Sequence, residues 1–175
     1  MQVGRVQMLT ELEGAILSEI EHRGQKTAFQ VRRAFAVSFS LEWKGSAGAV
    51  YPAVKRLEQR GLIQASVAQG GRATRTLSLT DLGKEELMSW ACDPIRATSI
   101  GIDPFRLRSG IWTQLTPGQR RKVFAEIRKE IEASIPILER YVTEIDRIER
   151  LRVELGIAVQ HARLKVLDRW NAEQL

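Results

Sequence analysis

One stretch, residues 45–63, constrains the fold of this chain more than any other. Its large apolar positions recur at intervals of four and three and so share one helix face: Val50, Val54 and Leu57. Small, hydroxylated, polar and cationic residues fall on a different face: Ala47, Gly48, Tyr51, Lys55 and Gln59. Ser46 is the predicted N-cap of this helix, and Gly61 is its predicted left-handed end. One side of the helix therefore needs a core, and the other is typical of a helix that recognises a partner.

Basic residues are concentrated around this stretch. Residues 22–80 contain ten lysines and arginines but only two acids, a balance of +8, whereas the whole chain of 175 residues carries +6. A basic segment in an otherwise nearly neutral chain indicates a surface that faces a polyanion. The alternative is a solvated face whose acids come from spatial neighbours, and charge alone leaves both interpretations open.

The composition limits the class of protein. With 43% hydrophobic and 27% charged residues, the chain resembles a soluble globular protein. No run of residues is apolar enough to span a bilayer, and the N-terminal residues lack the apolar core of a secretory signal. Cys92 is the single cysteine, which excludes an internal disulfide and suits a reducing compartment. We therefore expect a cytoplasmic protein without a membrane segment.

The residues before this stretch predict two further helices. Thr10 and Glu13 form a capping-box pattern, so a first helix is expected over residues 11–23. Thr27 can cap a second helix over residues 28–39. The apolar stripe expected for this second helix is Phe29, Val31, Ala34, Phe35 and Val37. Together with a short connection and the helix described above, these residues make a helix-turn-helix unit.

After this unit the apolar period changes from helical to two. Apolar residues alternate with polar ones in two short runs, Ala65 with Val67 and Leu77 with Leu79. The glycine-centred residues between the runs predict a β-hairpin, and Thr80 or Asp81 can cap a fourth helix that ends near Ala91. Three helices, a hairpin and a helix are the order of a winged helix-turn-helix domain, whose third helix enters the major groove of DNA.

The second half of the chain predicts a helical region. Residues 92–116 are interpreted as a linker with a short helix that Asp103 caps, and a long amphipathic helix begins after Thr116. Its stripe and that of a final amphipathic segment need burial: Phe124, Ile127, Ile131, Leu138, Tyr141, Ile145, Ile148, Leu155, Val159, Val166 and Trp170. The predicted fold is therefore mainly α, with a winged helix-turn-helix over residues 1–91 and a C-terminal helical domain over residues 117–175.

Two motifs resemble the PadR family of bacterial transcriptional regulators. The first comprises residues 48–58, which contain Val50-Tyr51-Pro52, followed by Gly61-Leu62-Ile63. The second is Gly70-Gly71-Arg72 leading to Leu79-Thr80-Asp81-Leu82-Gly83. Thr76 and Leu77 depart from the pattern, because the family usually carries two aromatic residues there. Pro52 removes one backbone hydrogen bond, so we expect a late or tightened start of the third helix.

The resemblance implies a DNA-binding transcriptional regulator, most often a repressor, that binds a pseudo-palindromic operator on double-stranded DNA. It also implies a homodimer formed by the C-terminal helices, so the stripe residues become the predicted dimer interface. Pro136 and Gly156 are helix breakers, but the resemblance favours a junction between the last two helices near residues 149–154. The predicted DNA contacts are Lys26, Thr27, Lys44, Ser46, Tyr51, Lys55, Arg56, Arg72 and Arg75. Of these, Arg56 could equally pair with Glu58 or with an acid elsewhere.

An enzymatic function finds little support in the sequence. His22 and His161 have no cysteine or carboxylate at metal-ligand spacing, and Cys92 lacks activating neighbours. Gly70-Gly71 is not followed by the helix start that a phosphate-binding loop needs. We therefore predict no catalytic residue, no metal and no cofactor. The alternative function is a winged-helix interaction module or co-regulator that binds protein without touching DNA.

Three tryptophans admit two interpretations: Trp90, Trp112 and Trp170. Burial tendencies favour packing in the core and at the dimer seam. The second interpretation is a pocket for a small aromatic effector between the winged domain and the C-terminal helices, as some members of the family have. The spacing of the tryptophans leaves both open.

Overall fold

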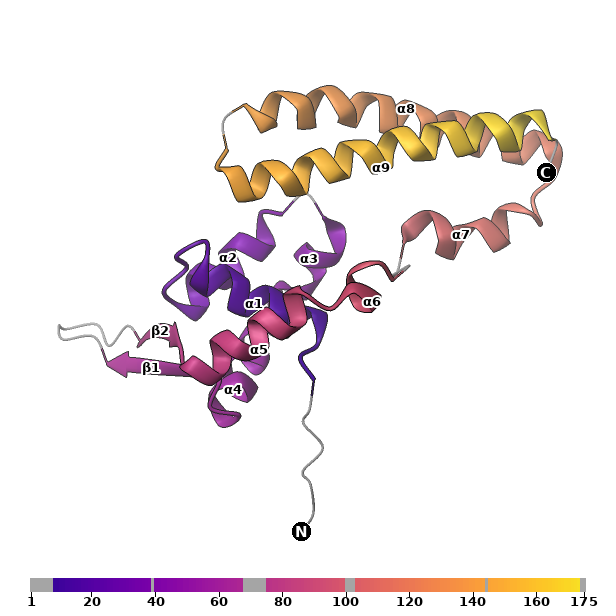
Figure 1. The fold of residues 1–175 in the computed structure, drawn as a ribbon. Coiled ribbons are helices and arrows are strands. Elements are labelled where there is room, and N and C mark those ends of the chain that lie inside the picture. The colour runs from indigo at the N-terminus through magenta and orange to yellow at the C-terminus, as the bar shows by residue number, and fades with distance from the viewer. Residues whose placement is uncertain (1–7, 39, 68–74, 100–102, 144, 174–175) are drawn as a thin grey trace, which may run out of the picture. The chain divides into compact units, whose positions relative to one another are not determined.

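The computed structural model of the chain describes residues 8–38, 40–67, 75–99, 103–143 and 145–173. They form two compact units, residues 1–99 and residues 100–175 (Figure 1). Each unit has its own hydrophobic core. The division between the units falls within the segment that the sequence analysis interprets as a linker.

The first unit is a winged helix-turn-helix fold, as predicted. Its elements follow the order α1 (Glu11–Glu21), α2 (Ala28–Ala36), α3 (Leu41–Ser46), the 3-10 turn η1 (Ala47–Ala49), α4 (Val50–Gln59), β1 (Ile63–Val67), β2 (Arg75–Leu79), α5 (Asp81–Ala91) and α6 (Pro94–Ala97). Side chains from α1, α2, α4 and both strands meet in one core, whose fully buried members include Ile16, Leu17, Ile20, Val31, Val50 and Leu57. This core holds α4 by its apolar face.

Side-chain caps fix where the helices begin. Thr10 Oγ1 accepts a hydrogen bond from Glu13 N, and Glu13 Oε2 accepts one from Thr10 N, which is the predicted capping box. Thr27 Oγ1 accepts from Gln30 N at the start of α2. The predicted caps at Thr80 and Asp103 are also present. These starts are confirmed because each depends on residues three or fewer positions apart.

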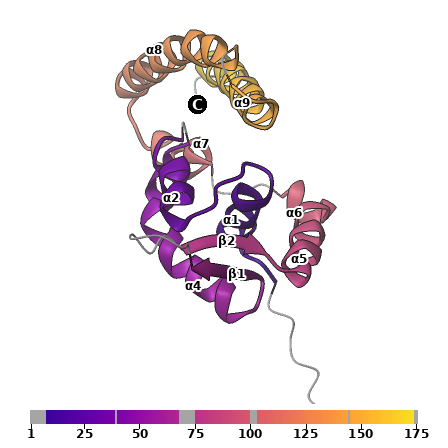
Figure 2. The same ribbon diagram turned by 90° about the vertical axis from the view of Figure 1, so that its left-hand side faces the viewer.

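The wing is an antiparallel pair of strands beside α4 (Figure 2). Ile63 lies opposite Leu79 and Ala65 opposite Leu77, so the alternating apolar residues face the core. Gly61 connects α4 to β1 with a φ of +69°, the left-handed conformation predicted for it. The predicted turn between the strands lies outside the described residues.

A short helix stands where the sequence predicts only a connection. Helix α2 ends at Ala36, and α3 follows because Ser40 Oγ accepts a hydrogen bond from Trp43 N at 3.4 Å. The Trp43 ring packs edge-on against Phe35, with the ring centroids 5.1 Å apart. Ser46 makes no side-chain cap, contrary to the prediction, because its backbone is already helical with φ −78° and ψ −10°.

The second unit consists of α7 (Pro104–Trp112), α8 (Pro117–Val142) and α9 (Arg147–Ala172). Helices α8 and α9 run antiparallel, side by side (Figure 1). Its core is formed by Trp112, Phe124, Ile131, Ile135 and Leu167. The fold class predicted for this half, helical throughout, is confirmed.

The predicted junction between the last two helices is wrong. The break occurs at residues 143–146, and Asp146 Oδ1 accepts hydrogen bonds from Ile148 N and Glu149 N to start α9. Pro136 lies inside α8, where burial of the adjacent Ile135 holds the segment in the helix despite the missing hydrogen bond. The aspartate cap, rather than the proline or glycine breakers, determines the boundary.

Candidate nucleic-acid interface

Helix α4, the predicted recognition helix, has one buried and one exposed face. Val50, Val54 and Leu57 are buried in the core of the first unit. Tyr51 exposes 49% of its surface on the other face, and Lys55 is exposed one turn later. Because the core fixes the apolar face, the direction of the two exposed side chains is set by the helix itself.

Pro52 fits α4 because the helix begins late. The 3-10 turn η1 precedes it, and Val50 is the first α-helical residue. Pro52 therefore stands in the first turn, where backbone N–H groups have no partner within the helix. The expected tightened start is confirmed.

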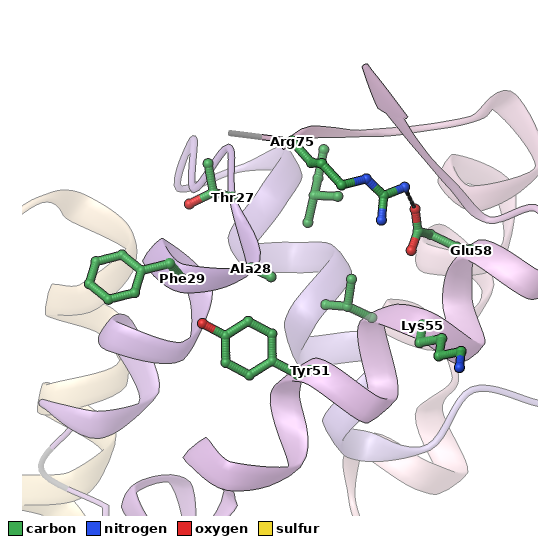
Figure 3. Close-up of a pocket in the computed structure, with 9 residues that line it drawn as sticks. Thr27, Ala28, Phe29, Tyr51, Lys55, Glu58 and Arg75 are labelled. Atoms are coloured by element: carbon green, nitrogen blue, oxygen red, sulfur yellow. Dashed lines mark hydrogen bonds and ion pairs between the residues drawn. The ribbon is translucent and has the colours of Figure 1, made fainter. Parts of the chain in front are cut away.

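An open groove of about 940 Å³ lies beside the exposed face of α4 (Figure 3). It is bordered by the start of α2, by α4 and by β2, through Thr27, Ala28, Phe29, Tyr51, Val54, Lys55, Glu58, Arg75 and Leu77. A backbone hydrogen bond of 2.7 Å from Leu77 N to Lys26 O ties the wing to the residues before α2. The groove therefore joins the elements that winged-helix domains present to DNA.

The charged groups of the groove differ in how they are held. Arg75 Nη2 lies 2.6 Å from Glu58 Oε1, so the acid of the groove is neutralised by the wing (Figure 3). Among the described residues, no hydrogen bond or ion pair engages the Lys55 ammonium. Lys55 thus offers an exposed cation without an ion-pair partner in the described part of the chain, and Arg75 offers one that an anion could share with Glu58.

A second ion-pair site joins α4 to α1. Arg56 Nε lies 3.1 Å from Glu13 Oε1, and Arg60 Nη1 lies 3.3 Å from Glu13 Oε2. Burial alone would raise the pKa of the Glu13 carboxyl, but hydrogen bonds from Thr10 and Arg56 and the charge of Arg60 outweigh burial, and the pKa is lowered. The carboxylate therefore stays ionised and links the two helices.

Comparison with known proteins identifies this arrangement. Residues 16–89 match the sequence model of the transcriptional regulator PadR-like family. The first unit therefore contains a PadR-like domain. Members of this family are DNA-binding transcriptional regulators. Comparison with curated protein sequences found no match.

Solved PadR-like structures share the fold of this chain. A PadR-like regulator from Bacillus cereus is 19% identical with a TM-score of 0.64, and the alignment covers 98% of this chain and 100% of that chain. Bacillus subtilis PadR in complex with operator DNA is 20% identical with a TM-score of 0.73, and the alignment covers 94% of this chain and 99% of that chain. The same Bacillus subtilis protein in complex with p-coumaric acid is 19% identical with a TM-score of 0.68, and the alignment covers 93% of this chain and 94% of that chain.

The PadR-like domain brings some of the predicted DNA contacts together and leaves others apart. Tyr51, Lys55, Thr27 and Arg75 line the groove. Lys26 and Lys44 are exposed outside its lining, and Ser46 is half-buried. Arg72 lies outside the described residues. Arg56 finds its partner in Glu13, the acid elsewhere that the sequence left open.

Three residues of this region were missed by the sequence analysis as functional candidates. Glu58 pairs with Arg75 across 17 positions, and Glu13 pairs with Arg56 across 43. Because the partners are so far apart in the sequence, no local sequence pattern predicts these two ion pairs. Phe29 was expected in the buried stripe of α2, yet it is exposed on the groove. Its offset of two from the buried Val31 is the signal that could have found it.

The three tryptophans have packing roles in their own units. Trp90 lies directly over Gly14, where an added Cβ would come within 2.3 Å of the indole ring. Trp112 packs edge-on against Trp170, with ring centroids 6.2 Å apart, and against Phe124 at 5.6 Å. The effector pocket therefore stays a prediction.

The predicted dimer residues divide into two groups within the second unit. Phe124 and Ile131 are buried inside the chain itself. Another group is half-buried: Ile127, Leu138, Tyr141, Ile145, Ile148, Val166 and Trp170. Leu155 and Val159 are exposed on α9, and Leu151, which the prediction omitted, is exposed one turn earlier. The dimer interface stays a prediction, and the exposed group is the part available to a partner.

Features of other functional classes are missing from the described part of the chain. It contains neither a group of metal-ligating side chains nor a helix long and apolar enough to cross a membrane. His22 is the C-cap residue of α1, and Cys92 is exposed.

Proposed function

We propose that this PadR-like protein binds double-stranded DNA at a specific operator and regulates transcription from it, as a repressor. The observation that carries the proposal is the exposed face of α4, where Tyr51 and the unpaired Lys55 stand beside the wing. Helix α4 would enter the major groove, with Lys55 on a phosphate and Tyr51 on a phosphate or base edge. The operator complex of Bacillus subtilis PadR supports this mode.

The remaining basic residues complete the proposed footprint. Lys26 and Thr27 precede the first turn of α2, whose N–H groups suit a phosphate. Lys44 and Ser46 on α3 would contact the neighbouring DNA phosphates. Arg72 and Arg75 of the wing would contact the adjacent groove of the DNA. Arg56 is left out of this footprint because Glu13 holds its guanidinium.

We further propose that the protein acts as a cytoplasmic homodimer and is not an enzyme. Leu151, Leu155 and Val159 repeat every four residues along α9 and are exposed, which suits a helix-to-helix contact. A symmetric dimer would place its two α4 helices on half-sites about 34 Å apart, so the operator would be pseudo-palindromic.

A small aromatic effector is the last part of the proposal. Its support is the structure of Bacillus subtilis PadR with p-coumaric acid, together with the aromatic cluster around Trp112. Titrating the full chain with p-coumaric acid while following tryptophan fluorescence tests it. Saturable quenching is expected, and an unchanged spectrum would contradict this part alone.

The DNA-binding claim is tested by fluorescence anisotropy of the full chain on a labelled duplex of arbitrary sequence. Binding should be measurable at low salt and should weaken steeply as salt rises, because phosphate contacts release counterions. An absence of affinity even at low salt would contradict the proposal and favour the alternative, a winged-helix module that binds protein.

A further inference from the structure

Phe29 is an exposed aromatic side chain that lines the groove and does not belong to the hydrophobic core of the first unit. It exposes 58% of its surface, whereas Val31 and Phe35 on the same helix are buried. Residues two positions apart lie about 200° apart around a helix, so Phe29 faces away from the core. A single exposed apolar side chain is ordinary on a protein surface, and its meaning depends on its neighbours.

The neighbours of Phe29 belong to the proposed DNA-facing surface. Its side chain lines the groove together with Tyr51 and Lys55 of α4, and the Tyr51 hydroxyl points toward the start of α2 (Figure 3). Thr27 caps this start through its hydrogen bond to Gln30 N, which holds the backbone of Phe29 in the first turn. The backbone of Phe29 therefore has a defined position beside α4.

The chemistry of the ring limits what it can recognise. A phenyl group carries no hydrogen-bond donor or acceptor, so it cannot read the polar pattern of base edges. The apolar feature of the major groove is the C5-methyl group of thymine. Arg75 neutralises Glu58 and Lys55 has no acidic partner among the described residues, so the charge around the ring favours the approach of DNA.

We propose that Phe29 packs against the methyl group of a thymine in each operator half-site and thereby contributes to sequence specificity. This inference rests on the proposed function, because it assumes that α4 enters the major groove. The start of α2 would then make two kinds of contact with DNA. Lys26 and Thr27 would contact a phosphate, and Phe29 would contact one base.

The test begins with selection of binding sites from a random duplex library, using the full chain and the variant Phe29→Ala. Thymines in the selected site are then replaced one at a time by deoxyuridine, which lacks only the methyl group. At one position per half-site, the replacement should weaken wild-type binding about fourfold, the value expected for one buried methyl group. Phe29→Ala should bind the thymine and deoxyuridine duplexes equally at that position.

Matched variants separate base contact from a general effect. Met88 is comparably exposed, at 57%, but lies on α5, so Met88→Ala should keep the response to deoxyuridine. Phe29→Leu should keep part of it, because leucine still offers an apolar surface. Thermal unfolding checks that each variant is folded.

The outcomes distinguish this inference from the proposed function. If the wild-type chain selects no sequence, the proposed function fails and the inference fails with it. If it selects a site but no thymine responds to deoxyuridine, the inference alone is overturned. Equal weakening of Phe29→Ala on every duplex, with its deoxyuridine response intact, would also overturn the inference.

Discussion

Glu13 Oε1 accepts a hydrogen bond from Arg56 Nε at 3.1 Å, which joins the first turn of α1 to α4. The side chain of Glu13 is only 4% exposed, and its second oxygen accepts from Thr10 N and from Arg60 Nη1. One carboxylate therefore completes a helix cap and holds Arg56 of α4 and Arg60, the residue that follows this helix. The orientation of α4 within the first unit depends on this group as well as on its apolar face.

The ionisation of Glu13 predicts a pH-dependent contribution to stability. Because its pKa is lowered in the folded chain, the contribution is fully present above the ordinary carboxyl pKa of 4.5 and is lost as pH falls through the folded value. Glu13→Gln should lower the free energy of unfolding by about 1–3 kcal/mol at neutral pH, measured by urea unfolding.

The difference between wild type and Glu13→Gln should shrink as the pH is lowered from about 7 to about 3. Glu85→Gln, an exposed change on α5, should have little effect at any pH. A difference between wild type and Glu13→Gln that stays constant across this range would show that the carboxylate charge is not what stabilises the pairing.

Gly83, in the first turn of α5, is a position where any side chain should destabilise the fold. A Cβ at this position would lie 1.9 Å from the carbonyl oxygen of Leu62, a backbone atom that cannot move aside easily. Gly83→Ala should therefore lower the free energy of unfolding by about 1–3 kcal/mol. Gly110→Ala is the control, because nothing lies within 4 Å of its added Cβ. Equal stability of the two variants would contradict the close approach.

The Arg75–Glu58 pair predicts opposite effects on DNA binding. Glu58→Gln removes the acid of the groove and frees Arg75, so affinity for duplex DNA at low salt should rise. Arg75→Gln should lower the affinity and reduce the salt slope by about one. Both changes should alter stability by less than about 1 kcal/mol, because the Arg75 side chain is 60% exposed and water screens the pair. Weaker binding by Glu58→Gln would contradict this assignment.

The exposed stripe of α9 predicts the position of the dimer contact. Leu151 and Leu155 expose 61% and 68% of their surfaces, so replacing both with glutamate should leave the chain folded and shift it to a monomer. Sedimentation velocity at micromolar concentration measures the change. Ile95→Glu, at a residue 81% exposed on α6, should remain dimeric. A wild-type chain that sediments as a monomer would contradict the dimer itself.

Local signals explain how much of the fold could be predicted from the sequence. Thr10, Thr27 and Asp103 start helices through hydrogen bonds to N–H groups two or three residues ahead, and Gly61 ends one with its own backbone conformation. The alternation of apolar and polar residues likewise predicts the two strands of the wing. In each case the residues that decide the structure are neighbours in the sequence.

The remaining features depend on contacts that the sequence does not place. Ser46 looked like a cap, but α3 and η1 run into α4 so that its backbone is helical. Pro136 stays in α8, where the adjacent Ile135 is buried, and the break occurs only before the cap at Asp146. The partners of Arg56 and Arg75 come from distant elements, so the candidate site could be named only in outline.

The most direct measurement of the central claim compares Lys55→Gln with Lys165→Gln on duplex DNA. Lys55 stands on the exposed face of α4, whereas Lys165 is exposed on α9 in the other unit. Anisotropy across a range of salt concentrations should show weaker binding and a salt slope reduced by about one for Lys55→Gln only. Identical binding by wild type and both variants would contradict the assignment of α4 as the DNA-recognition helix.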